Sequence, residues 1–121
     1  MPYKNIFTFL FFIALAISTH LFLAQGINSG VQIPHFDKFA HFVVFFGLAL
    51  LLDLSFSMQT TKALGLALVY GISIELMQST VPGREASIAD IVFDLVGSAC
   101  YYYLVQNWLR IQIKKTVQHN S

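Results

Sequence analysis

The chain carries eight ionisable or amide side chains close to the ends of its long apolar segments. A charged side chain at the centre of a membrane helix costs roughly 2.5 to 3.5 kcal/mol on insertion scales, so a small apolar chain that keeps several has a use for them. Imidazole, carboxylate and guanidinium groups together transfer protons, hold polar ligands or bind anionic groups. The set is Asp37, Lys38, His41, Glu75, Gln78, Arg84, Asp90 and Asp94.

Asp37, Lys38 and His41 stand at the start of one apolar segment. Asp37 and His41 are four residues apart, which stacks their side chains on one face of a helix and lets them share a proton or a ligand. The alternative is an interfacial ion pair beside a histidine at the level of the lipid headgroups. Taken alone, the two interpretations are about equally supported.

Glu75 and Gln78 are three residues apart near the end of another apolar segment. About five residues inside that segment, the Glu75 carboxylate must be paired, protonated or hydrated. Ala63, Ala67 and Gly71 precede it on the same helical row, and such small residues let membrane helices approach closely. We expect Glu75 to belong to a site; a hydrogen bond that only joins two helices is the alternative.

Asp90 and Asp94 form a third pair at helical spacing, and Arg84 follows a Pro-Gly turn just before them. Two neighbouring carboxylates repel if both ionise, so one holds a proton unless a lysine, an arginine or a metal neutralises the pair. Asp90 alone also fits a first-turn acid that complements the helix dipole. Arg84 suits a bidentate grip on a phosphate or carboxylate, or a contact with lipid headgroups.

The segments that position these residues are long enough to cross a membrane. Of the 121 residues 56% are hydrophobic and 11% charged, which indicates an integral membrane protein rather than a soluble domain. We predict an all-α membrane protein that forms a single domain over residues 1–121. Its four transmembrane helices are expected at about 6–24, 39–56, 62–81 and 88–109.

Charge distribution predicts the orientation of these helices. The positive-inside rule places both termini in the cytoplasm and the polar set at or near the outer face. The basic residues expected inside are Lys4, Lys62, Arg110, Lys114 and Lys115, against Lys38 and Arg84 outside.

Several residues near the inner side are expected to be structural. Asp53 is read as a local hydrogen-bond partner outside the site. We expect the tail from Gln112 to fray. The aromatic residues predicted to be interfacial anchors are Tyr101, Tyr102, Tyr103 and Trp108.

The spacing from Asp37 to Gly97, half of the chain, resembles the VanZ-like family, small bacterial membrane proteins associated with glycopeptide resistance and teicoplanin tolerance. The family usually has Asn at the position of Asp94, and often Tyr at that of Phe45. The resemblance implies a multi-pass protein of the bacterial plasma membrane with an envelope function. The motifs that carry it are Asp37-Lys38-x-x-His41, Glu75-x-x-Gln78, Pro82-Gly83-Arg84-x-x-Ser87-x-x-Asp90 and Gly97.

Three functions remain open. The first is a factor that binds or modifies a lipid-linked envelope component or a glycopeptide, with Arg84 and Lys38 on the anionic group. The second is an enzyme in which His41 or Glu75 is the general base and Asp90 or Asp94 a charge partner or metal ligand. The third is a structural or proton-coupled subunit, for which a homo-oligomer is expected.

The expected environment is the lipid bilayer. The balance of 7 basic and 6 acidic residues argues against nucleic acid as a partner. No cofactor is expected, and the sequence contains no compact metal-binding motif.

Overall fold

The computed structural model describes residues 2–24, 36–80 and 87–119, all within or next to helices. No strand occurs in these three stretches. The helices are α1 (Pro2–Ala24), α2 (Phe36–Phe56), α3 (Thr60–Gln78), α4 (Ile88–Cys100), the π-helical turn η1 (Tyr101–Val105) and α5 (Gln106–His119).

Four helical segments are long and apolar enough to cross a membrane, which confirms the predicted all-helical membrane protein. They are Lys4–Leu23, Lys38–Phe56, Thr60–Gln78 and Ile88–Gln118. A helix satisfies its backbone hydrogen bonds within the segment, as the hydrocarbon core requires. The helix at the end of the chain continues to His119, so the prediction of a frayed tail from Gln112 is wrong. The tail contains Gln and Lys, which favour helix, and it extends a helix that packing has already formed.

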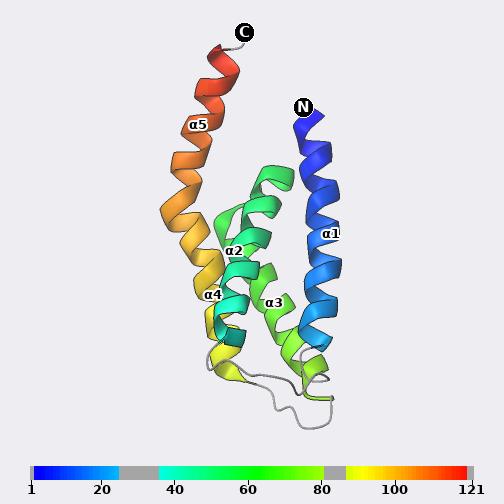
Figure 1. Cartoon of the computed structure of the whole chain (residues 1–121). Helices are drawn as coiled ribbons and strands as arrows, with labels where there is room; N and C mark the ends of the chain where they lie inside the picture. The colour runs from blue at the N-terminus through cyan, green and yellow to red at the C-terminus, as the bar shows by residue number, and fades with distance from the viewer. Residues whose placement is uncertain (1, 25–35, 81–86, 120–121) are drawn as a thin grey trace.

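The helices alternate in direction along the bundle (Figure 1). α2 packs mainly against α1 and α4, and α3 packs mainly against α4. The beginning of α1 and the end of α5 lie at the same end (Figure 1). That arrangement agrees with an even number of crossings; the cytoplasmic assignment of this end stays a prediction.

Two glycines set how closely α4 approaches its neighbours. A Cβ atom at Gly97 would overlap the main-chain carbonyl of Phe42 on α2. A Cβ atom at Gly71 on α3 would lie 2.7 Å from the Asp94 Oδ2 atom. The small-residue row on α3 therefore admits α4, and the residue brought against Gly71 is Asp94.

The π-helical turn η1 changes which tyrosines face the bundle. Tyr101 and Tyr102 are 0% and 4% exposed, whereas Tyr103 and Trp108 are 70% and 61% exposed. The predicted anchoring role is wrong for the first two and fits the exposure of the others. Because a π turn is wider than an α turn, adjacent side chains lie closer on one face and both tyrosines reach the interior.

Candidate functional site

The start of α2, the end of α3 and the start of α4 lie at the end of the bundle away from the start of α1 and the end of α5 (Figure 1). These three helix ends carry five buried polar side chains, none more than 2% exposed. We call them the polar cluster. Its members are His41, Glu75, Gln78, Asp90 and Asp94.

The imidazole of His41 is held by Asp94. Its Nδ1 atom lies 2.6 Å from Asp94 Oδ1, a charge-assisted hydrogen-bond distance. The ring of Phe22 stacks on the imidazole with centroids 4.3 Å apart, which fixes the plane of the ring. A neutral imidazole that donates its Nδ1–H to Asp94 has its lone pair on Nε2, and Nε2 of His41 lies 3.8 Å from Asp90 Oδ2.

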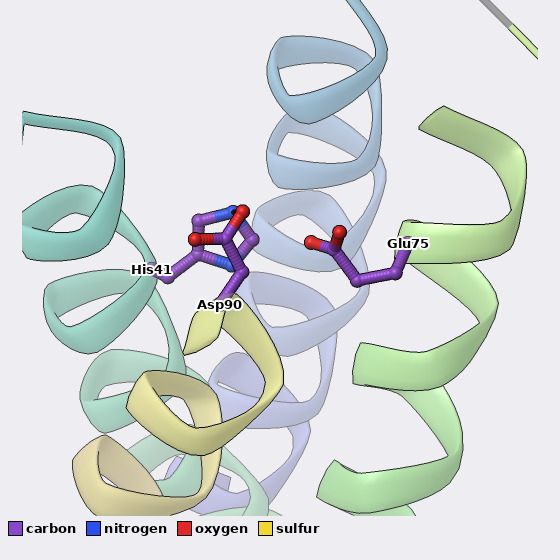
Figure 2. A group of neighbouring side chains, drawn as sticks. All are labelled: His41, Glu75 and Asp90. Atoms are coloured by element: carbon purple, nitrogen blue, oxygen red, sulfur yellow. Dashed lines mark ion pairs between the residues drawn. The ribbon is translucent and has the colours of Figure 1, made fainter. Parts of the chain in front are cut away.

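Glu75 connects the end of α3 to the start of α4. Its Oε2 atom accepts a hydrogen bond of 2.8 Å from the main-chain N–H of Ser87. The Ser87 hydroxyl in turn accepts from the N–H of Asp90 at 3.2 Å and caps α4. These bonds hold Glu75 close to the start of α4. The side chains of His41, Glu75 and Asp90, from three helices, are directed toward one another (Figure 2).

The amide nitrogen of the Gln78 side chain has a structural role. Its Nε2 atom donates a 2.8 Å hydrogen bond to the main-chain carbonyl of Phe22. Phe22 lies in the last turn of α1, where carbonyls have no partner within the helix. The amide of Gln78 therefore caps α1 and ties it to α3.

The remaining predicted site residues lie at the edge of the cluster or beyond the described part of the chain. Lys38 Nζ is 3.8 Å from Asp90 Oδ1, and the lysine side chain is 29% exposed. The side chain of Asp37 and the whole of Arg84 lie outside the described residues.

Every member of the polar cluster retains hydrogen-bonding capacity that is not used. Within the described stretches, one buried atom of each member has no hydrogen-bond partner. Buried polar atoms are nearly always satisfied, so atoms left over in one place indicate a ligand, a shared proton or an ordered water. The atoms are His41 Nε2, Glu75 Oε1, Gln78 Oε1, Asp90 Oδ1 and Asp94 Oδ2.

Comparison with known proteins identifies the family. The chain matches the VanZ/LLP1 family model over residues 2–110. The protein belongs to the VanZ/LLP1 family. Searches of curated proteins and of solved structures give no match. This VanZ/LLP1 protein is thus a helical membrane protein in which the motif residues His41, Glu75, Gln78 and Asp90 lie together in one buried cluster.

A second buried acid of the VanZ/LLP1 protein, Asp53, has hydrogen-bond partners on both carboxylate oxygens. Asp53 Oδ2 accepts a 2.6 Å hydrogen bond from the Tyr101 hydroxyl. Asp53 Oδ1 accepts from Gln106 at 3.1 Å and from Arg110 at 3.0 Å. Both oxygens are satisfied, so the prediction that Asp53 is a local hydrogen-bond partner is confirmed.

Replacement of Asp53 by alanine is expected to lower the free energy of unfolding by about 3 kcal/mol, because buried hydroxyl and amide donors lose their acceptor. Thermal unfolding of the detergent-solubilised protein measures the effect. Arg110→Ala is the matched comparison: the Arg110 side chain is 55% exposed, so its loss should cost less than about 1 kcal/mol. Equal losses of unfolding free energy in Asp53→Ala and Arg110→Ala would contradict the structural role of Asp53.

Two contributors to the cluster were not assigned a role from sequence. Phe22 acts through its carbonyl and its ring, and nothing in an apolar α1 distinguishes it from neighbouring phenylalanines. Ser87 acts through its main-chain N–H and as the cap of α4. Its position three residues before Asp90 is typical of a helix N-cap, and that pattern could have found it.

Proposed function

We propose that this VanZ/LLP1 protein acts in the bacterial plasma membrane, where the polar cluster binds or modifies a lipid-linked envelope component. The unused hydrogen-bonding capacity of the cluster carries the proposal. A carboxylate that served only to join helices would be satisfied as Asp53 is. Five side chains at one end of the bundle each keep a buried polar atom without a partner among the described residues, and this favours a ligand instead.

A neighbouring apolar cavity supports a lipid-linked ligand. It has a volume of about 340 Å³ and is lined by residues from all four membrane segments. Phe45 lines the cavity, and its ring centroid lies 6.4 Å from that of His41. Ser98, one turn along α4 from Asp94, lines it as well. A molecule with a polar head and an apolar chain has complementary surfaces at these two adjacent places.

The distribution of basic residues supports an outward-facing site. Lys4 and Lys62 stand at the starts of α1 and α3, which lie at the end of the bundle opposite the polar cluster (Figure 1). Basic residues are enriched on the cytoplasmic side, so the cluster faces the outer leaflet in this proposal. A lipophilic glycopeptide such as teicoplanin also meets the membrane at the outer leaflet. Teicoplanin tolerance is the phenotype we expect.

The hydrogen bond between His41 and Asp94 favours a second candidate, an enzyme that uses acid–base chemistry. With Nδ1 bound to Asp94, the buried Nε2 atom can remove a proton from a bound hydroxyl or water. Binding and catalysis are separated by turnover: formation of product from a lipid-linked substrate by the purified protein supports the enzyme.

Expression of the wild-type protein in a sensitive bacterium is expected to raise tolerance of teicoplanin more than of vancomycin. With the variant Glu75→Gln, teicoplanin tolerance should fall to that of cells with the empty vector, because the substitution keeps the shape of the side chain and removes its charge. Susceptibility to both antibiotics is measured with membrane levels matched by immunoblot.

Asp53→Asn is the control, since it also neutralises a buried carboxylate but lies outside the polar cluster. It should retain tolerance at matched levels. Tolerance unchanged in Glu75→Gln would separate the cluster from the function, and no tolerance from the wild type would reject the glycopeptide role in that host.

A further inference from the structure

Three side chains from three helices present metal-ligating atoms to one point. One atom each of His41, Glu75 and Asp90 lies within 4.8 Å of the other two. The side chains are 0%, 1% and 2% exposed, and they converge (Figure 2). His41 Nε2, Glu75 Oε1 and Asp90 Oδ1 have no hydrogen-bond partner in the described part of the chain. The Nε2 atom of His41 lies 3.8 Å from Asp90 Oδ2, so an imidazole nitrogen stands beside the carboxylates.

The other side of the imidazole has the environment of a metal ligand. A histidine that binds a metal usually donates its second ring N–H to a carboxylate, which fixes the tautomer and makes the ligating nitrogen more basic. His41 Nδ1 lies 2.6 Å from Asp94 Oδ1, and the opposite nitrogen is the one that faces Asp90. The ring is also clamped by Phe22.

The charge of the cluster also favours a cation. Glu75, Asp90 and Asp94 place three carboxylates in a buried volume, with Lys38 Nζ 3.8 Å from Asp90 at its edge. Removing a carboxylate from water costs several kcal/mol unless an opposite charge lies nearby. One divalent ion between Glu75 and Asp90 adds two positive charges to the one that Lys38 brings to Asp90 Oδ1.

We propose that His41 Nε2 and the carboxylates of Glu75 and Asp90 bind one divalent transition-metal ion of the Zn²⁺ or Mn²⁺ type. The imidazole ligand favours these ions over Mg²⁺ and Ca²⁺, which prefer oxygen alone. A tetrahedral ion with bonds of about 2.1 Å holds its ligands about 3.4 Å apart, close to the 3.8 Å between His41 Nε2 and Asp90 Oδ2.

Three protein ligands leave a coordination position open. The identity of the ligand rests on the proposed function: a phosphate oxygen of the lipid-linked component occupies the open position. The ion thereby lets an acidic cluster receive an anionic headgroup. The metal site itself does not depend on that ligand.

The test uses the full chain, purified in detergent with its affinity tag removed and then treated with EDTA. After equilibrium dialysis against Zn²⁺ or Mn²⁺, we expect elemental analysis to find about one ion per chain. Electron paramagnetic resonance of the Mn²⁺-loaded protein should show coupling to one imidazole nitrogen. Neither measurement uses lipid or antibiotic, so failure here is distinct from failure of the tolerance assay.

Glu75→Gln and Asp90→Asn should reduce the bound ion to background, with folding verified by circular dichroism and size-exclusion chromatography. His20→Asn is the control, because His20 is an exposed histidine of α1 outside the cluster. Asp94→Asn preserves an acceptor for His41 Nδ1 and removes the charge, so its affinity for the ion should fall at least about tenfold. It keeps the shape of the side chain, which makes it the variant of choice if the others do not fold.

Folded wild-type protein that binds neither ion would overturn the proposal. So would full metal content in Glu75→Gln and Asp90→Asn, since the ion would then lie elsewhere. A Mn²⁺ spectrum without nitrogen coupling would exclude His41 as a ligand and overturn it as well.

Discussion

His41→Ala is expected to lose function and to unfold more readily than any other single variant of the polar cluster. The change removes the partner of Asp94 Oδ1 and the ring that stacks on Phe22. It leaves a buried carboxylate uncompensated and a cavity beside it, which together cost about 3 to 5 kcal/mol. Thermal unfolding in detergent measures the stability, and the teicoplanin assay measures the function.

A double-mutant cycle separates loss of the His41–Asp94 pair from loss of packing. His41→Gln and Asp94→Asn are made singly and together, and a coupling free energy of about 1 to 3 kcal/mol is expected because the two side chains share one short hydrogen bond. His20→Ala on α1 should change stability by less than about 0.5 kcal/mol, since that side chain is exposed. Additive effects of the two cluster substitutions would show that the pair is not coupled.

Gly97→Ala is expected to have the largest effect among substitutions of the four glycines in the described stretches. The added Cβ atom would overlap the main-chain carbonyl of Phe42, and backbone cannot rotate away as a side chain does. α4 must therefore move from α2 or tilt. We expect a loss of about 2 to 3 kcal/mol, despite the gain of up to about 1 kcal/mol in helix propensity. The shift should also disturb the polar cluster, because Asp94 lies one turn earlier on α4.

Gly47→Ala on α2 is the matched control, because a Cβ atom there has no neighbour within 4 Å among the described residues. Its stability should be unchanged or slightly higher. Thermal unfolding and antibiotic tolerance are measured for both glycine variants at matched membrane levels. Equal stability of Gly97→Ala and Gly47→Ala would mean that α2 and α4 do not pack closely at Gly97.

Membrane segments could be predicted from sequence because they depend on local properties. The length of an apolar run and the polar residues between runs are enough to locate crossings, and the structure places helices in all four predicted regions. Since consecutive helices alternate in direction, residues at the end of one span and the start of the next share one end of the bundle. His41, Glu75 and Asp90 could therefore be grouped before their contacts were known.

Specific partners depended on tertiary structure. Sequence spacing suggested Asp37 as a neighbour of His41, and the side chain of Asp37 lies outside the described residues. The contact that the structure describes is with Asp94, on a different helix. The rotation of α4 and its approach at Gly71 and Gly97 create that contact, and no local pattern encodes either. The difference between Asp53, whose two oxygens both have partners, and Glu75, whose Oε1 has none among the described residues, has the same origin.

The conformation of the chain after Cys100 could also not be predicted without the tertiary structure. A sequence of tyrosines near the end of a span is typical of interfacial anchors, yet Tyr101 is buried and bonded to Asp53. The turn η1 packs against α2, and α5 continues from η1 to His119; hydropathy predicts neither feature. The sequence by itself determined which segments cross the membrane and which end of the bundle carries the polar residues. Packing between helices that are distant in the sequence decided which of those residues touch, because their contacts depend on how closely and at what rotation the helices approach.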